Sequence, residues 1–342
     1  MKKDRDRDRK IPGPLMSRSF QISVFSISVF LLVFCVYASA QQPGRIWRVG
    51  LLTLSALPDH EALLEGLRDL GYVEGRNLSI ERRNAEGHRE RLPDLAADLV
   101  RTKVDAIVAQ SNFGASAAAK ATAIIPIVFV TLGDPVEEGL VASLARPGGN
   151  LTGFSLAAPE LSGKRLEIFR EVVPTLKRVV VLMNPANPRL RAGLKEMEIG
   201  ARSLGVRLRV VEVRDVTDLD KAFTTIKSEP VDGLIVEGDP ILLGQRVRIF
   251  DFVNQHRLPA IYGDSPATWT GAGGLIAYGA SLPQMYRRAA AYVDKVLRGT
   301  KPGDLPVERP AKFELVINLK AAKQIGLTIP PNVLARADKV IK

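Results

Sequence analysis

The sequence has 342 residues, of which 48 are lysine or arginine and 37 are aspartate or glutamate, so its formal net charge is +11. The basic residues are scattered along the chain without a dense tract, which argues against a nucleic-acid-binding protein. A single cysteine, Cys35, excludes a disulfide within the chain and a cysteine-rich zinc site.

The first forty residues have the pattern of an export signal. Charged residues fill Met1–Lys10, an uncharged apolar stretch runs over Phe20–Tyr37, and Ala38-Ser39-Ala40 supplies the small residues that a signal peptidase requires. We expect cleavage before Gln41 and a periplasmic protein. The alternative is a retained anchor helix, because an apolar stretch of about 18 residues is borderline for crossing a bilayer.

The remaining part, about 300 residues, is long for a single core. Apolar runs that predict buried strands alternate there with stretches whose apolar residues recur at helical spacing. The strands predicted in the first block are Ile46–Leu54, Leu78–Arg82, Asp105–Ala109 and Ile127–Thr131, and the helices are Asp59–Leu70, Arg91–Lys103, Phe113–Ala123 and Asp134–Leu144.

The same alternation restarts near residue 179. Because strands that alternate with helices form parallel sheets with right-handed crossovers, the fold class predicted is α/β with two Rossmann-like lobes. The strands of this second block are Val179–Met183, Leu208–Val213, Gly233–Glu237, Ala260–Tyr262 and Leu275–Tyr278, and the helices are Leu190–Leu204, Asp218–Ser228, Leu243–Gln255 and Pro283–Leu297.

Two glycine-rich stretches lie at the seams of this pattern, at 148–153 and 271–274. Glycine tolerates the dihedral changes of a hinge, although either stretch could be an ordinary loop. With a third crossing near Leu305–Glu308, we expect an N-terminal lobe of residues 45–150 plus 277–305 and a C-terminal lobe of residues 153–273 plus 308–342.

Signatures of catalysis are weak in this sequence. Gly148 and Gly153 have phosphate-loop spacing, but Phe154 stands where the lysine should be. There is no Gly-x-Ser-x-Gly nucleophile elbow. The three histidines, His60, His88 and His256, lack a paired metal-ligand spacing. We therefore predict a protein that is not an enzyme and that has no metal site and no cofactor.

Small polar residues follow most of the predicted strands. In open α/β sheets ligands bind beyond the carboxyl ends of the strands, where helix N-termini offer free N–H groups. Helix capping is the alternative role of each such residue. The candidate turns are Thr53 with Ser55, Ser111-Asn112-Phe113-Gly114-Ala115-Ser116, Gly133-Asp134-Pro135, Asn184-Pro185-Ala186-Asn187-Pro188, Glu237-Gly238-Asp239-Pro240 and Gly263-Asp264-Ser265-Pro266.

Several of these turns carry a family resemblance. The run Gly133-Asp134-Pro135-Val136, then Gly139-Leu140-Val141 and Arg146 to Gly153, resembles the ABC-transporter substrate-binding proteins of the tryptophan/tyrosine-binding type. Smaller matches include Gly71-Tyr72, Asn184-Pro185 and Ile317-Asn318-Leu319, and together they extend over nearly all of 45–342.

The resemblance implies a periplasmic-binding-protein fold of type I-like architecture, with three crossings and two lobes that close on a small molecule. It implies an ABC permease and ATPase as partners and an amino-acid-like or small organic ligand, and we expect a monomer that binds no nucleic acid. The sequence departs from the usual pattern at 264–270, where Trp269 stands, and at the Phe113 turn, which leaves the ligand's identity open.

Roles for the candidate residues follow from their chemistry. The helix N-terminus at Ser111–Ser116 would hold an anionic group, and Asp134 would pair with a cationic group, with Glu237 and Asp239 as second choices. An apolar or aromatic moiety could stack on aromatic rings. The complete set of candidate ligand-binding residues is Ser55, Ser111, Asn112, Phe113, Gly114, Ala115, Ser116, Asp134, Asn184, Asn187, Glu237, Asp239, Tyr262 and Asp264, with Trp269 as a further stacking candidate.

Two other functions share this fold. A periplasmic sensor that passes its ligand state to a signalling protein would have the same two lobes. A two-lobed Rossmann-like enzyme is disfavoured by the export signal and by the lack of a nucleotide fingerprint. Our prediction is the solute-binding component of an ABC importer.

Overall fold

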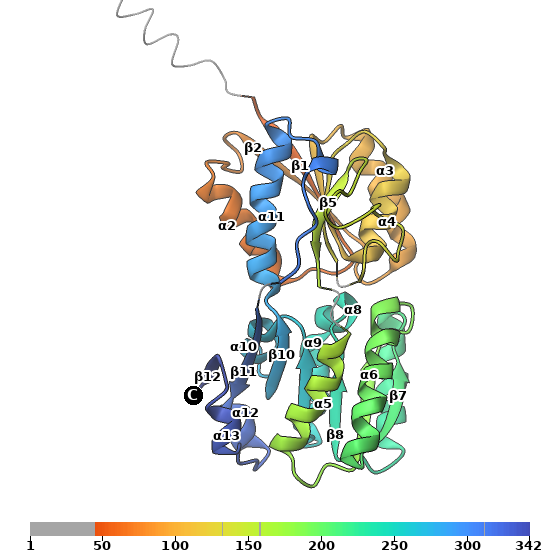
Figure 1. Ribbon diagram of the computed structural model, residues 1–342, viewed down its shortest axis with the longest axis vertical. Coiled ribbons are helices and arrows are strands. Elements are labelled where there is room, and N and C mark those ends of the chain that lie inside the picture. Colours follow the sequence, from red (N-terminus) through yellow and green to blue (C-terminus); the bar gives the residue numbers. More distant parts are fainter. Residues whose placement is uncertain (1–44, 132, 157–158, 311) are drawn as a thin grey trace, which may run out of the picture. The chain divides into compact units, whose positions relative to one another are not determined.

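The computed structural model of the protein describes residues 45–131, 133–156, 159–310 and 312–342. The predicted export signal, residues 1–40, lies outside these ranges. Two sheets organise residues 46–342 (Figure 1). None of the helices in the described ranges has the length and apolar character needed to cross a membrane.

The first lobe is built on a five-stranded parallel sheet in the order β2-β1-β3-β4-β5. Helices α2 and α11 pack together over one face, and α3 and α4 cover the other (Figure 1). Every residue of β3, β4 and β5 is buried, as expected of parallel strands covered on both faces. The elements are β1 (Trp47–Thr53), α2 (Glu61–Asp69), β2 (Leu78–Asn84), α3 (Leu92–Arg101), β3 (Ala106–Gln110), α4 (Ser111–Ala121), β4 (Ile127–Thr131), β5 (Leu151–Ser155) and α11 (Leu282–Leu297), with short 3₁₀ turns η1 (Pro58–His60), η2 (Arg89–Arg91) and η4 (Pro302–Asp304).

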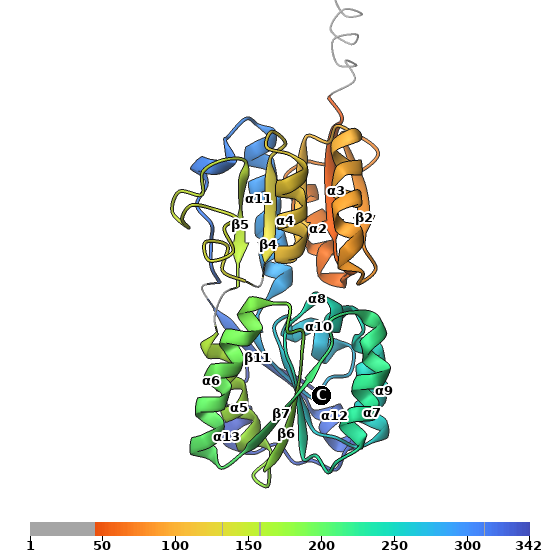
Figure 2. The same cartoon turned by 90° about the vertical axis from the view of Figure 1, so that its right-hand side faces the viewer.

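The second lobe has a seven-stranded sheet in the order β12-β11-β10-β9-β8-β6-β7. Its strands are parallel except for the antiparallel pair β10 and β11. Helices α5 and α6 pack together on one face, and α7 and α9 lie over the other (Figure 2). The elements are α5 (Glu160–Val172), β6 (Arg178–Met183), α6 (Pro188–Leu204), β7 (Arg207–Glu212), η3 (Val216–Asp218), α7 (Leu219–Lys227), β8 (Gly233–Val236), α8 (Pro240–Gly244), α9 (Arg246–Gln255), β9 (Ala260–Gly263), α10 (Pro266–Gly271), β10 (Ile276–Ala280), β11 (Phe313–Asn318), α12 (Leu319–Gln324), α13 (Pro331–Leu334) and β12 (Lys339–Ile341).

The two sheets repeat one topology. The strand order β7-β6-β8-β9-β10 of the second sheet reproduces the order β2-β1-β3-β4-β5 of the first. The predicted fold class, two Rossmann-like lobes, is therefore confirmed, and β11 and β12 are an addition at the edge of the second sheet.

The chain passes between the sheets at three places. The first passage follows Ser155, because β5 belongs to the first sheet, and the second lies between β10 and α11. The third follows Glu308, which still pairs with Phe154 of the first lobe before β11 joins the second sheet. The first two passages lie beyond the predicted glycine-rich seams, since β5 and β10 run on past the glycines.

One predicted helix is wrong. Residues 134–144 form a series of turns, in which Asp134 Oδ1 accepts the backbone N–H groups of Val136 and Glu137. Gly139 follows in the left-handed region at φ 68°, and Leu140 N–H bonds back to the Pro135 carbonyl. Proline and glycine so close together leave no room for a regular helix.

Candidate functional site

A small cavity lies where the carboxyl ends of strands from both sheets meet. Its volume is about 20 Å³, enough for a single water molecule. An amino acid could enter only if the lobes moved apart. The lining residues are Leu57, Gln110, Ser111 and Val130 from the first lobe, Gly238, Asp239, Pro240, Leu243, Gly263, Asp264 and Trp269 from the second, and Leu282 and Tyr286 from the start of α11.

The first-lobe wall is the junction between β3 and α4. Gln110 ends β3, and its Oε1 accepts the backbone N–H groups of Leu54 at 2.7 Å and Ser55 at 3.1 Å, which fixes the amide in place. Its Nε2 is buried and has no partner among the residues that the structure describes. The next residue, Ser111, begins α4, and its hydroxyl accepts the backbone N–H of Gly114 at 3.4 Å, whereas the Gln110 side chain makes no cap bond to this turn. The other N–H groups of this first turn lie at a helix N-terminus, which suits an anionic group.

The second-lobe wall centres on Asp239, which precedes α8. Its Oδ1 accepts the backbone N–H of Ile241 at 2.9 Å, a normal N-cap. Its Oδ2 lies 3.3 Å from Nδ2 of Asn184 and 3.5 Å from Nδ2 of Asn187. Burial raises the pKa of the Asp239 carboxyl, and the hydrogen bonds counter that shift only in part. This carboxylate is poised to accept a further donor.

The buried charges of this wall do not balance. Arg165 pairs with Glu237, and Arg189 pairs with Asp264 at 2.7 Å. Asp239 is equally buried, yet it forms no ion pair with any residue that the structure describes. The wall therefore holds three buried carboxyl groups and two arginines, and Arg189 offsets the burial of Asp239 only in part. A buried carboxylate is costly unless a cation joins it, so the geometry favours a ligand with a positively charged group.

Unpaired polar atoms are concentrated in the same region. A buried donor or acceptor without a partner costs roughly 1–3 kcal/mol, so native proteins keep few of them. Several belong to the cavity lining or to the side chains directly behind it. They are Gln110 Nε2, Asn187 Oδ1, Arg189 Nε and Nη1, Asp264 Oδ1, Glu237 Oε1 and Arg165 Nη2.

Backbone strain marks the same walls. Ser111 has φ 66°, Asp264 has φ 51° and the adjacent Ser265 has φ 44°, all in the left-handed region that non-glycine residues avoid. Strain of this kind costs about 1–3 kcal/mol per residue and gathers at ligand sites. Both walls of the cavity therefore hold a non-glycine residue in a costly conformation.

Some of the residues predicted from the sequence line this cavity, and others lie behind its lining or elsewhere. Ser111, Asp239, Asp264 and the stacking candidate Trp269 line it directly. Asn184 and Asn187 stand behind Asp239, and Glu237 is held by Arg165. The following residues of α4 show graded burial: Asn112, Gly114 and Ala115 are buried, whereas Phe113 and Ser116 are partly exposed.

Three other candidates have different surroundings. Ser55 is buried where the lobes touch, since a Cβ built on Gly244 would lie 2.9 Å from the Ser55 Cβ. Asp134 caps its own turn and pairs with Arg309 at 3.0 Å, outside the cavity lining. Tyr262 is fully buried with its ring stacked on Trp269 at 4.6 Å, so Trp269 lies between this ring and any ligand.

Sequence reasoning missed several residues of the walls. Gln110 directly precedes the predicted turn at Ser111, and Arg189 directly follows the one at 184–188, so extending each turn by one residue would have included both. Arg165 had no such signal. It lies in α5, 72 residues from its partner Glu237, and only the tertiary structure brings them together.

Comparison with known proteins agrees with this architecture. A sequence model of the family described as ABC transporter substrate binding protein matches residues 55–341. A tyrosine-binding protein of Clostridioides difficile is 27% identical over 282 residues, which are 80% of this chain and 80% of that protein.

Solved structures are similar as well. A conserved domain protein from Vibrio cholerae has a TM-score of 0.77 at 29% identity, and an ABC domain in complex with L-Trp from Streptococcus pneumonia has 0.76 at 24%. Each match covers 86% of this chain and 100% of the other. These likenesses confirm the predicted fold of type I periplasmic binding proteins. Because the family match extends over most of the sequence, the chain belongs to the ABC transporter substrate-binding proteins.

Proposed function

We propose that the cleft between the lobes captures an amino acid with an apolar or aromatic side chain. The single observation that carries this proposal is the buried Asp239 carboxyl group, which forms no ion pair with any described residue. The α-amine of the ligand would pair with Asp239, and its carboxylate would face the N–H groups that begin α4 at Ser111.

The rest of the lining supports an apolar side chain. Apolar side chains make up the rest of the lining beside the polar groups. They are Leu57, Val130, Leu243, Leu282 and the ring of Tyr286. Such a combination of apolar walls and a few polar anchors is typical of small-molecule sites. Relatives point the same way, since one is described as a tyrosine-binding protein and another was solved with L-Trp.

The proposed mechanism is lobe closure without covalent chemistry. The cavity is too small for an amino acid, so the ligand would bind to separated lobes and the passages between the sheets would let them close over it. The liganded, closed form would then be recognised by an ABC permease with its ATPase. We also propose export to the periplasm with cleavage before Gln41, which intact-mass measurement of the periplasmic protein would test.

The binding proposal is tested by calorimetry of Asp239→Asn with tyrosine, tryptophan and leucine. Asparagine caps a helix as well as aspartate does, so the change removes the charge and keeps α8 capped. We expect a loss of about 2–5 kcal/mol, which is at least roughly tenfold in affinity. Ligand analogues without the amine should bind the parent weakly and lose nothing further in the variant.

The matched control is Asp134→Asn, another capping aspartate, whose ion-pair partner Arg309 lies outside the cavity lining. We expect it to bind as tightly as the parent. If Asp134→Asn lost affinity and Asp239→Asn did not, the amine would have to be assigned to Asp134, as the sequence alone first indicated.

A further inference from the structure

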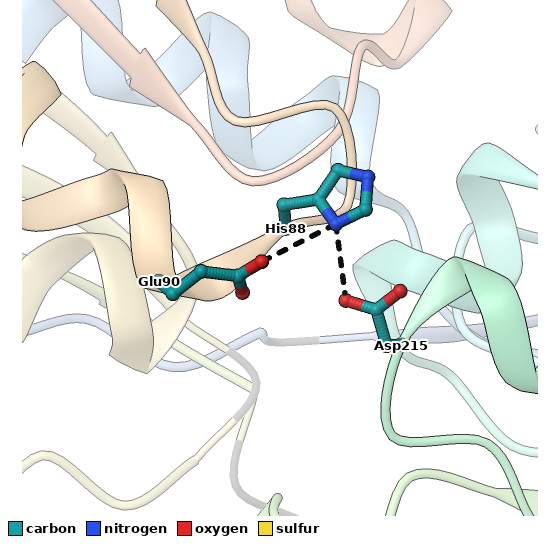
Figure 3. A group of neighbouring side chains, drawn as sticks. All are labelled: His88, Glu90 and Asp215. Carbon is teal, nitrogen blue, oxygen red and sulfur yellow. Dashed lines mark ion pairs between the residues drawn. The ribbon is translucent and has the colours of Figure 1, made fainter.

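A second cluster of potential ligand atoms lies away from the cavity, at a different contact between the lobes. His88 and Glu90 belong to the segment between β2 and α3 of the first lobe, and Asp215 precedes η3 in the second lobe (Figure 3). His88 Nδ1 lies 3.4 Å from Glu90 Oε1 and 3.3 Å from Asp215 Oδ2. Figure 3 shows both carboxylates turned toward this one nitrogen.

The spacing of these atoms fits a metal ion. Zinc binds imidazole nitrogen and carboxylate oxygen at about 2.0–2.2 Å, so two ligand atoms in a tetrahedral site stand about 3.3–3.5 Å apart. The separations of 3.4 Å and 3.3 Å agree with that value, and the three ligand atoms all lie within 4.8 Å of one another. One imidazole and two carboxylates leave a fourth position for water.

Backbone hydrogen bonds position two of the three residues, Asp215 and His88. The Oδ1 of Asp215 accepts the backbone N–H of Thr217 at 3.0 Å, which leaves Oδ2 for His88. The N–H of His88 bonds to the Ala85 carbonyl at 2.9 Å. Beside the cluster, a Cβ on Gly87 would lie 2.2 Å from Val216 Cγ1, so the loops of the two lobes are in direct contact.

Charge in the cluster also favours a cation. Within the described ranges, neither Glu90 nor Asp215 forms an ion pair with lysine or arginine. Two of the neighbouring arginines are engaged elsewhere, Arg91 with Glu86 and Arg214 with Glu212. A divalent cation would balance the two carboxylates beside a neutral imidazole, which binds through Nδ1 when its proton is on Nε2.

We propose that His88, Glu90 and Asp215 form a site for Zn²⁺, or a similar first-row divalent cation, that bridges the two lobes. Imidazole and carboxylate ligands suit this class of metal. Because Asp215 comes from the other lobe, the complete site exists only when the lobes are together. Metal binding and ligand binding would then each strengthen the other, a coupling that rests on the proposed function, whereas the metal site itself does not.

The site is tested by titrating ZnCl₂ into the mature protein, prepared without a polyhistidine tag, treated with chelator and dialysed into a non-coordinating buffer at neutral pH. Calorimetry should show one saturable equivalent. Loss of a ligand should weaken it at least about tenfold in His88→Ala and in Asp215→Asn, the latter keeping the η3 cap. The control Asp220→Asn removes an exposed carboxylate of the same lobe and should bind like the parent.

Absence of saturable zinc binding, or equal zinc affinity in the parent and Asp215→Asn, would overturn the proposed metal site between the lobes. A second arm measures tyrosine and tryptophan affinity with and without zinc. We expect zinc to tighten that affinity roughly fivefold or more in the parent and to leave Asp215→Asn unchanged. Equal amino-acid affinity with and without zinc in the parent would overturn the coupling.

The proposals of an amino-acid cleft and of a metal site can be tested independently. Amino-acid binding in chelator tests the cleft alone, and zinc titration without amino acid tests the metal site alone. One equivalent of zinc without any amino-acid binding would support the metal site and overturn the proposed ligand class, and the opposite result would do the reverse.

Discussion

Ser265 and Asp59 join the two lobes through a buried hydrogen bond, in which the Ser265 hydroxyl donates to Asp59 Oδ1 at 2.5 Å. Thr268 donates to the same oxygen at 2.7 Å. Asp59 belongs to η1 of the first lobe, whereas both hydroxyls come from the start of α10 in the second. Burial raises the pKa of the Asp59 carboxyl, and the two hydroxyls offset part of that shift. This contact forms only when the lobes are together.

The first prediction concerns this contact. Thr268→Val keeps the shape of the side chain and removes the hydroxyl, so the closed form loses one donor to a buried carboxylate. We expect a loss of about 1–2 kcal/mol, or roughly 5- to 30-fold in affinity for the cleft ligand. Calorimetry with tyrosine or tryptophan measures it. Thr224→Val, which removes an exposed hydroxyl from α7, should bind normally. An unchanged affinity in Thr268→Val would remove this contact from the closure mechanism.

The second prediction concerns pH. Burial lowers the pKa of the His60 imidazole to about 4, from an ordinary value of 6.5, and its ring stands edge-on to Tyr286 at 4.9 Å. Because the pKa of His60 is lower in the folded protein than in the unfolded chain, the stability that the neutral His60 contributes is fully present above pH 6.5. It is lost as the pH falls toward 4, where the unfolded chain takes up a proton that the folded chain refuses. The loss amounts to about 3 kcal/mol.

Urea unfolding at pH 7 and pH 4 checks this effect. His60→Phe should remove about 3 kcal/mol of the parent's decline in unfolding free energy between the two pH values. His256→Gln, which replaces an exposed histidine, should decline as the parent does. The difference between parent and variant also cancels the contribution of Asp59, whose raised pKa acts in the opposite direction. Parallel declines in parent and His60→Phe would contradict the prediction.

Strands that are buried on both faces were the easiest elements to predict. The strand at 127–131 was predicted with the bounds that the structure shows, because it reads as an unbroken apolar run. By contrast β5 (LTGFS) was missed, since a glycine and two hydroxyl residues give it low strand propensity although every residue is buried. Local composition predicts a strand only where burial has selected bulky apolar residues.

Some residues of the candidate site could be predicted from the sequence and others could not. Asp239 was predicted because it follows a strand at the edge where parallel strands end, a rule that holds for any open α/β sheet. Gln110 was missed because it is the last residue of a strand, where sequence alone indicates packing. Arg165 was missed because a charged residue in a helix usually faces solvent, and nothing local shows that this one is fully buried.

The third prediction concerns the buried pair of Arg165 and Glu237. Arg165→Met leaves the Glu237 carboxylate buried without its cation and also breaks the bond from Arg165 Nε to the Tyr278 carbonyl. We expect a loss of about 3–5 kcal/mol in the free energy of unfolding. The double variant Arg165→Met/Glu237→Met should recover much of it, because no buried charge is left alone.

Denaturant unfolding of the two single variants and the double variant gives the coupling energy of the pair. The half-exposed pair of Arg309 and Asp134 is the control, and Arg309→Met should cost no more than about 1 kcal/mol. A double variant as unstable as Arg165→Met would show that the carboxylate is not the source of the loss.

The last prediction separates a hinge glycine from a packing glycine. Gly153 lies at a seam of the sequence pattern, but in the structure it is the middle residue of β5 and pairs with Phe129 of β4. Its φ is 151°, and a Cβ there would lie 2.0 Å from the Phe129 carbonyl oxygen and 2.6 Å from its nitrogen. These are backbone atoms, so no rotamer change relieves the clash. Gly149 has φ 62° with nothing within 4 Å of its Cβ position.

Gly153→Ala should therefore lower the free energy of unfolding by at least about 3 kcal/mol or prevent folding. Gly149→Ala should cost only the left-handed conformation, about 1–2 kcal/mol. Denaturant unfolding compares the two, and the yield of soluble protein is the readout if Gly153→Ala does not fold. A hinge role predicts the reverse pattern, namely normal stability and altered ligand affinity in Gly153→Ala. That result would mean that β4 and β5 separate during closure, because only their separation would make room for the added methyl group.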